Sequence, residues 1–163
     1  MGECVWVDVD GAIKSLIEAQ MGKASAYTTL KLATVKATRI ESSQDWKSWA
    51  LPGCAIVGSI VPYVDAKRHG DGLPHYEKAY RYEVLFIVEG DQEIAFRYAK
   101  ILIKRCELAL RTVGIGVQSS PDNEHTDRNK PLLALAEVRL LRHPTPDTFY
   151  GLGSLEFTVH SAV

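Results

Sequence analysis

The sequence has almost no net charge and few cysteines. Nineteen basic side chains stand against twenty acidic ones, for a formal net charge of −1, whereas a dedicated nucleic-acid binder normally carries a clear basic excess. Cys4, Cys54 and Cys106 are odd in number and far apart, a pattern that favours reduced thiols over a disulfide framework. Both observations argue against a dedicated nucleic-acid-binding protein and against a disulfide-stapled secreted domain.

Long apolar runs are missing too. No uncharged segment is long enough to cross a bilayer, and residues 1–3 are not followed by the basic region and apolar run of a signal peptide. We therefore expect no membrane partner. An apolar content of 46% and a charged content of 24% over 163 residues are typical of a globular protein with a substantial core. With no internal repeat and no linker, the sequence predicts a single domain over residues 1–163.

Recognisable metal-binding spacing is also lacking. His69, Asp71 and His75 lie close together in the segment 65–76, which a small metal-dependent enzyme would use to hold its ion. The segment is rich in glycine, contains no cysteine and lacks the i, i+4 spacing that a helix gives to metal ligands. A solvated loop is therefore the preferred interpretation, and the metal-dependent enzyme is kept as an alternative.

Phosphate loops and catalytic nucleophiles have equally weak signals. Gly114 and Gly151 each begin a Gly-x-Gly triplet, but neither triplet runs from a strand into a helix or ends in the Lys-Ser/Thr of a phosphate loop. We expect a helix-stop and a turn there. No serine lies in a nucleophile elbow, and Cys106 falls among apolar helix positions, as a small hydrophobic residue does. The sequence thus predicts no catalytic residue, no metal ligand, no cofactor-binding residue and no cofactor.

What the sequence does contain is a strong strand-to-helix unit at residues 80–113. Apolar residues alternate from Tyr80 to Val88, which predicts a strand with one buried face. From Asp91 the polar residues recur at steps of three and four around a broad apolar face, which predicts an amphipathic helix. Asp91 is suited to cap the first turn of this helix, and Gly114 to end it.

The flanking segments complete the pattern. A short helix is expected at 13–21, and Asp8 or Asp10 is interpreted as its cap. Further strands are expected at 29–40, 54–64, 132–142 and 155–162, with a loop or short helical turn at 41–49 and a turn at Pro52-Gly53. The order predicts an α+β fold, with a mostly antiparallel sheet of four to five strands and two helices packed on one face. The opposite face, which carries Lys36, Glu83, Glu137 and Arg139, is expected to be partly wet or buried against another subunit.

Two long polar segments, 65–79 and 114–131, are expected to project from the body as arms. Long loops in compact domains are often functional. The first arm is locally basic and the second is rich in acidic residues, and opposite local charges suit head-to-tail joining of copies; two solvated loops are the alternative. The interface candidates are Lys67, Arg68, His69, Tyr76, Lys78 and Arg81 in or beside the first arm, and Asp122, Glu124, Asp127, Arg128 and Lys130 in the second.

Trp46 and Trp49 are the remaining interface candidates. Two tryptophans three residues apart are expected to pack with one ring against the sheet and the other at its rim. Tryptophan is also favoured at interface hot spots. A cellular binding module that uses both rings as anchors is therefore a further alternative.

The order of these features resembles the tail terminator proteins of long-tailed bacteriophages. The matching features are a short helix, a strand before Pro52-Gly53, a long arm, the Y-x-Y-x-V-x-F-x-V strand from Tyr80, the D-x-E-x-A turn at Asp91 that leads into the long helix, and a final strand pair. The resemblance is one of pattern and covers most of the chain. It implies a hexameric ring on the end of the tail tube, which stops tube polymerisation and offers a docking surface to the head connector.

The same resemblance implies a place in the virion, at the tail or neck, after assembly in the host cytoplasm. DNA would pass through the lumen without specific binding, and the family has no catalytic residues to carry over. The chain departs from the family pattern in its long 114–131 segment and in the segment with Trp46 and Trp49. These departures leave open another neck role or a minor tail role.

Overall fold

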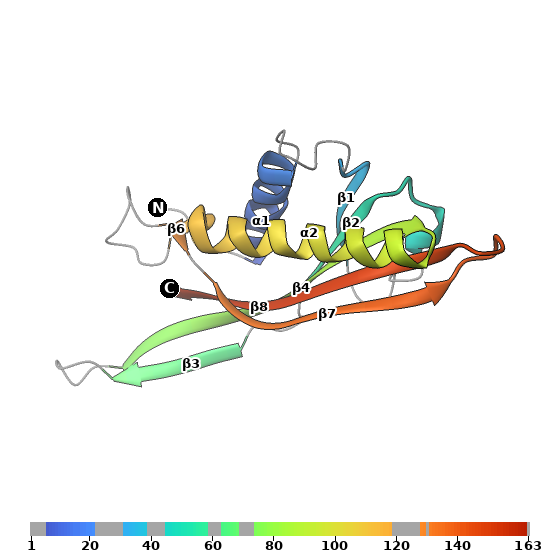
Figure 1. The fold of residues 1–163 in the computed structure, drawn as a ribbon. Helices are drawn as coiled ribbons and strands as arrows, with labels where there is room; N and C mark the ends of the chain where they lie inside the picture. Colours follow the sequence, from blue (N-terminus) through green and yellow to red (C-terminus); the bar gives the residue numbers. More distant parts are fainter. Residues whose placement is uncertain are drawn as a thin grey trace.

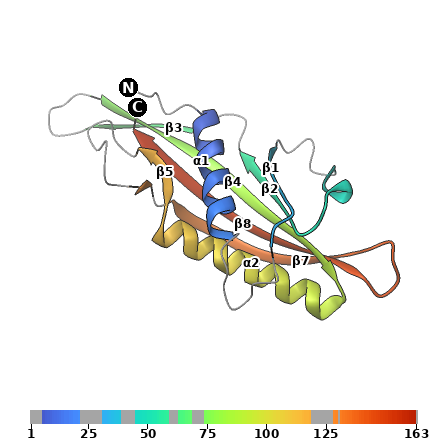
Figure 2. The ribbon, with the colours of Figure 1, turned by 90° about the horizontal axis from the view of Figure 1, so that it is seen from above.

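The computed structural model describes residues 6–21, 31–38, 45–58, 63–68, 74–118, 128–129 and 131–162. Two helices, α1 (Trp6–Met21) and α2 (Gln92–Thr112), lie on one face of a sheet (Figures 1 and 2). The strands and the short 3-10 helix are β1 (Thr34–Thr38), η2 (Asp45–Ser48), β2 (Gly53–Gly58), β3 (Tyr63–Arg68), β4 (Pro74–Gly90), β5 (Ile115–Gln118), β6 (Arg128–Asn129), β7 (Leu132–Arg142) and β8 (Phe149–Ala162).

The main sheet has the strand order β1-β2-β4-β8-β7, and β3 pairs with β4 beside this path. The β1–β2 pair is parallel, and the other described pairs are antiparallel. The predicted α+β class, with a mostly antiparallel sheet and helices on one face, is confirmed. The centre of the sheet is β4, whose 17 residues pair with β2, β3 and β8.

The strand-to-helix unit forms as its sequence pattern predicts. The Oδ1 atom of Asp91 accepts a hydrogen bond from the backbone N–H of Ile94 at 2.8 Å and so caps α2. After the last turn, Gly114 adopts a φ of 75° and its N–H donates to the carbonyl of Ala109 at 3.0 Å. A positive φ costs glycine little, and Gly114 therefore ends the helix, as expected.

The N-terminal helix begins earlier than predicted, and the capping interpretation of its acidic residues is wrong. Asp8 and Asp10 lie inside α1, which starts at Trp6. Asp10 instead accepts a hydrogen bond from the Tyr82 hydroxyl at 2.6 Å. The partner is on β4, 72 residues away, so local sequence could not reveal it. This bond ties α1 to the centre of the sheet.

Three of the predicted strands have different bounds. The segment 54–64, predicted as one strand, contains nearly all of β2, which ends at Gly58, and the first two residues of β3, which begins at Tyr63. The strand predicted at 29–40 is observed only as Thr34–Thr38 within the described residues. The last strand begins at Phe149 rather than at Leu155.

The early start of β8 corrects the interpretation of its glycines. Gly151 and Gly153 lie within the strand and not in a turn. A Cβ built at Gly151 would lie 2.3 Å from the carbonyl oxygen of Ala95. The backbone of α2 therefore packs directly on β8, and glycine is needed at this point for that close approach.

Both predicted arms contain paired strands. In the first, β3 pairs with the start of β4, with Asp65 opposite Glu77, and this hairpin extends away from the two helices (Figure 1). In the second, β5 pairs with β6, while 119–127 and 130 lie outside the described residues. The alternative of two solvated loops does not hold for the paired parts of the two arms, which are strands.

The core has two parts, one on each face of the sheet. The larger cluster joins the apolar sides of α1 and α2 to the alternating residues of β4 and β8, such as Tyr80, Phe86 and Phe157. The smaller cluster lies on the opposite face, where Trp46, Ile87, Tyr150 and Leu152 are buried together. We call this second face the outer face. Neither α1 nor α2 is long and apolar enough to span a membrane.

Candidate interaction surfaces

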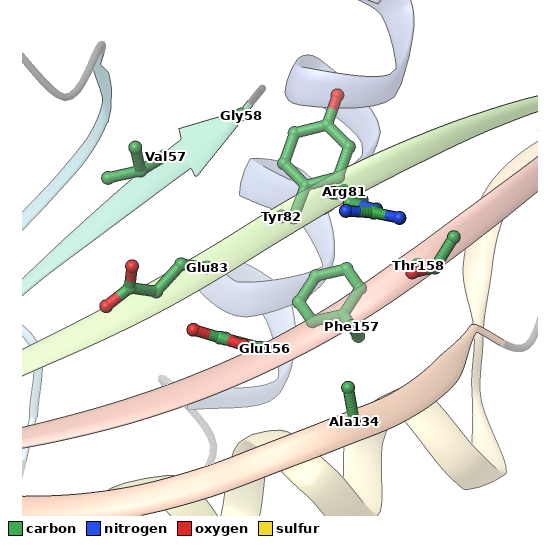
Figure 3. A pocket seen from close by; sticks show the side chains of 9 residues that line it. All are labelled: Val57, Gly58, Arg81, Tyr82, Glu83, Ala134, Glu156, Phe157 and Thr158. Carbon is green, nitrogen blue, oxygen red and sulfur yellow. The ribbon is translucent and has the colours of Figure 1, made fainter. Parts of the chain in front are cut away.

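A hollow of about 450 Å³ opens on the sheet beyond the smaller core cluster. Figure 3 shows the side chains that line it, which come from β2, β4, β7 and β8. Its polar groups are Arg81 and Glu83 of β4, and Glu156 and Thr158 of β8. The predicted interface residue Arg81 is exposed on the outer face, and it lines the same hollow as Glu83 and Glu156.

The two glutamates of this hollow face each other. Glu83 lies directly opposite Glu156 in the β4–β8 register, and like charges directly across a strand pair destabilise a sheet. Ser154 donates a hydrogen bond to Glu83 Oε1 at 2.8 Å, which supports one of the two carboxylates. The hollow is thus a place where the local charge arrangement favours a cationic neighbour.

Three strands form unpaired edges of the main sheet within the described part of the chain: β1, which pairs with β2 alone, β3 and β7. β7 stands last in the strand order and pairs with β8 alone. β3 pairs with β4 alone and lies at the opposite border of the sheet. An unpaired edge presents a row of backbone N–H and C=O groups that another strand can bind.

A groove of about 360 Å³ runs beside the β7 edge, between that strand and α2. Its apolar part is formed by Phe96 and Ile103 of α2 and by Ala136 and Val138 of β7. Phe96 is 41% exposed, so its large apolar ring is accessible from the groove. The groove lies along the helix-facing side of the open β7 edge. If another strand were added to this edge, every second side chain of that strand would point toward the groove.

Charged residues border the same groove. Lys100, Lys104 and Glu107 line it from α2, and Glu137 lines it from β7. Lys100 Nζ lies 4.8 Å from the centre of the Phe96 ring, and Glu107 pairs with Arg111 at 3.7 Å. The groove therefore has an apolar floor and a polar rim, as protein interfaces do.

The two tryptophans have the predicted arrangement, one against the sheet and one at its rim. Trp46 is 7% exposed and makes an edge-to-face contact with Tyr150, with 4.9 Å between the ring centres. Trp49 is half-buried, with Lys36 Nζ 5.0 Å from its ring centre. Because Trp46 is buried within its own chain, Trp49 is the ring that a partner could reach.

The end of β7 is held by a fixed turn. His143 Nε2 lies 3.1 Å from Glu89 Oε2, and His143 Nδ1 accepts a hydrogen bond from the Thr145 N–H at 3.0 Å. The same ring contacts Tyr150 with 4.5 Å between the centres. These contacts attach the β7–β8 turn to β4 and hold the open edge in place.

The described thiols are poorly suited to nucleophilic chemistry. Burial raises the pKa of Cys54 well above 9.0, and the nearby Cys106 adds to this effect. Burial raises the pKa of Cys106 to about 12, with a further contribution from Glu107. A thiol must ionise to act as a nucleophile, and both thiols remain protonated near neutral pH.

The other predicted interface residues fall into two groups. Lys67 and Arg68 lie in β3, Tyr76 and Lys78 in the first part of β4, and Arg128 in β6. His69, Asp122, Glu124, Asp127 and Lys130 lie outside the described residues. The described charged residues of the first arm, such as Lys67 and Lys78, therefore lie in paired strands.

The metal-binding alternative receives no support from the described residues. His75 belongs to β4, opposite Lys67, while His69 and Asp71 lie outside the described residues. In the described part of the chain, no three His, Cys, Asp or Glu side chains come together as metal ligands would.

Sequence reasoning missed the groove beside β7. The available signal was Phe96, which interrupts the polar stripe of α2, together with the exposed apolar residues Leu135 and Leu141 of β7. What the sequence did not reveal is the strand order, which puts β7 at the border of the sheet. Whether a strand is an edge depends on contacts between distant segments.

Comparisons with known proteins identify no family for this chain. No protein-family model and no curated protein matches the sequence. Among solved structures, a chain from the virion of a native gene transfer agent particle is similar over 94% of this chain and 98% of that chain, with 14% sequence identity and a TM-score of 0.49. At this level of identity and superposition the similarity assigns no function.

Proposed function

We propose that this chain is a structural subunit of a phage-like virion, and specifically the tail terminator. In this role it forms a hexameric ring on the head-proximal end of the tail tube, halts tube polymerisation and offers the docking surface for the head connector. DNA passes through the lumen of the ring without specific binding. The chain acts through its surface, and we assign it no catalytic role.

The observation that carries the proposal is that open strand edges lie at opposite borders of one sheet, with β3 at one border and β7 at the other. A heterologous, head-to-tail interface needs two different surfaces on each copy, and it closes into a ring when the rotation between copies is right. β3 and β7 are two such surfaces. Strand addition at an edge supplies main-chain hydrogen bonds, and pockets for alternate side chains supply specificity.

The sequence pattern supports the same assignment. Most elements on which the resemblance to tail terminators depends are present in the structure: a first helix, a projecting hairpin, the β4 strand, a capped α2 and a final strand pair. The expected strand that ends at Pro52-Gly53 is not among the described elements, because β2 begins at Gly53. The near-zero net charge is compatible with a lumen that lets DNA pass without holding its phosphates.

A tube-capping assay tests the proposal. The tail tube protein encoded beside this chain is polymerised with and without it, and tube lengths are measured by negative-stain electron microscopy. We expect shorter tubes that carry extra density at one end, and the effect saturates at a fixed ratio of chain to tube ends. Unchanged tube lengths with bare ends would exclude the terminator role, and binding elsewhere on the particle would favour another neck or minor tail role.

A further inference from the structure

We propose that β3 of one copy adds to the β7 edge of the next copy, antiparallel and in one defined register, and thereby joins the two sheets. The inference rests on the proposed self-assembly and specifies which surfaces meet. The occupant of the groove beside β7 is then the β3 strand of a second copy of this chain.

Strand directions within one chain make this pairing possible. β3 is antiparallel to β4, β4 to β8, and β8 to β7, so β3 and β7 run in opposite directions. A second copy in the same orientation, placed beside the β7 edge, therefore presents its β3 antiparallel to β7. Its outer face then continues the outer face of the first copy, and no strand has to be turned over.

The faces of the two strands also match. Glu137 and Arg139 lie opposite Ser154 and Leu152 of β8, on the outer face. In β3, positions 65 and 67 lie opposite positions 77 and 75 of β4. These two positions are an even number of residues from Arg81 and Glu83, so they lie on the same, outer face of the strand. Asp65 and Lys67 therefore occupy outer-face positions, as Glu137 and Arg139 do.

Charge selects the register. With Ala66 beside Val138, the antiparallel pairing sets Asp65 beside Arg139 and Lys67 beside Glu137, which gives two opposite-charge pairs on one face. A slide of two residues sets Asp65 beside Glu137 or Lys67 beside Arg139, and either brings like charges together. Strand registers are specified by such side-chain patterns, and of these three registers only the first pairs opposite charges at both positions.

The helix-facing side of the same register is compatible with the groove. In this register, positions 64 and 66 of β3, which are Val and Ala, fall beside Leu140 and Val138 of β7, and Val138 lines the groove. Position 68, an arginine, falls beside Ala136 of β7, which also lines the groove.

The test uses paired charge reversals that preserve both net charge and local ion pairs. Variant X carries Glu137→Lys and Arg139→Glu, which keeps the ion pair that these residues form within β7 at 3.9 Å. Variant Y carries Asp65→Lys and Lys67→Glu. The matched control carries Lys14→Glu and Glu18→Lys, which reverses an exposed pair on α1 at 3.7 Å.

Assembly is measured by mass photometry and light scattering over a concentration series. We expect X and Y each to need a roughly tenfold or higher concentration for assembly, because two attractive pairs become repulsive, while the control assembles like the wild type. An equimolar mixture of X and Y is expected to recover assembly, since each reversed edge then meets a reversed partner. The variant with all four substitutions is expected to assemble alone.

Disulfide trapping gives a second readout. Asp65→Cys with Arg139→Cys, in a Cys4→Ser background, is expected to give a ladder of cross-linked copies on oxidation, whereas Asp65→Cys with Lys14→Cys is not. Three results would overturn the β3–β7 pairing and leave the proposed function standing: variants X and Y that assemble like the wild type, a mixture of X and Y that does not recover assembly, or equal ladders from both cysteine pairs. A wild type that stays monomeric at every concentration would overturn both.

Discussion

The contact between α2 and β8 allows a sharp prediction about Gly151. A Cβ built there would lie 2.3 Å from the carbonyl oxygen of Ala95, 2.8 Å from its carbonyl carbon and 2.9 Å from Val88 Cγ2. Two of these three atoms belong to the helix backbone, which has no alternative rotamer. Gly151→Ala must therefore displace α2 from β8 or bend the strand. Among the described glycines only Gly114 has a positive φ, so backbone strain at Gly151 plays no part.

The expected cost follows from the rigidity of these neighbours. Overpacking a core typically costs about 1–3 kcal/mol, and backbone obstacles place Gly151→Ala at the upper end, at about 3 kcal/mol. One kcal/mol lowers the Tm of a domain of this size by roughly 2–4 °C, which predicts a loss of roughly 6–12 °C. Gly153→Ala should cost less, because two of its closest atoms, at 2.9 Å, belong to the Ile103 side chain, which can move.

Gly11 provides the matched control. It lies in α1, and a Cβ there would meet nothing within 4 Å. Gly11→Ala is expected to stabilise the protein by about 0.5–1 kcal/mol, because alanine loses less backbone entropy in a helix than glycine does. Thermal and urea unfolding, followed by circular dichroism, measure all three variants. A Gly151→Ala variant whose Tm lies within 1 °C of the wild-type Tm, or which is more stable than Gly153→Ala, would refute the direct packing of α2 on β8.

Three further outcomes are expected. Folding raises the pKa of the Cys106 thiol from 9.0 to about 12. The free energy of unfolding should therefore fall as the pH rises between these two values, by up to about 1.4 kcal/mol per pH unit. Cys106→Ala should make the unfolding free energy, measured by urea titration at several pH values, depend less steeply on pH over this range. An unchanged pH dependence would contradict the raised pKa. Tyr82→Phe removes the 2.6 Å hydrogen bond to Asp10 and should cost about 1.5–3 kcal/mol in urea unfolding; a loss below about 0.5 kcal/mol would count against that bond. Glu156→Gln relieves repulsion with the opposite Glu83 and should add about 0.2–1 kcal/mol, a gain that must shrink in high salt if its origin is electrostatic.

The parts of the fold that could be predicted are those specified by neighbours in the sequence. The alternation from Tyr80 to Val88 and the polar stripe of α2 reflect strand and helix periods directly. Asp91 and Gly114 act through hydrogen bonds to residues within one turn. Each of these features needs no information from a distant segment.

The parts that could not be predicted depend on distant contacts. Asp10 resembles a helix cap until its partner Tyr82 is known. Gly151 resembles a turn glycine until α2 is placed on β8. The polar segment that contains β3 shows no apolar alternation, because its strand is specified by pairing with β4.

The candidate surfaces were predicted only in part for the same reason. The basic character of the first arm could be read from Lys67 and Arg68, but its role as a strand edge could not. The groove beside β7 is formed by residues of α2 and β7 more than 25 positions apart, such as Phe96 and Val138. Strand order, and with it the position of an open edge, emerges only when the whole sheet is assembled.

The size of the native assembly tests the central claim most directly, because the claim is that this chain acts by joining copies of itself around a tube end. Light scattering across a concentration series, followed by negative-stain imaging of the same samples, measures that size. The account predicts a discrete oligomer that appears as closed rings with a central hole. A chain that remains monomeric at every concentration, and that forms no ring when tail tubes are present, would contradict it.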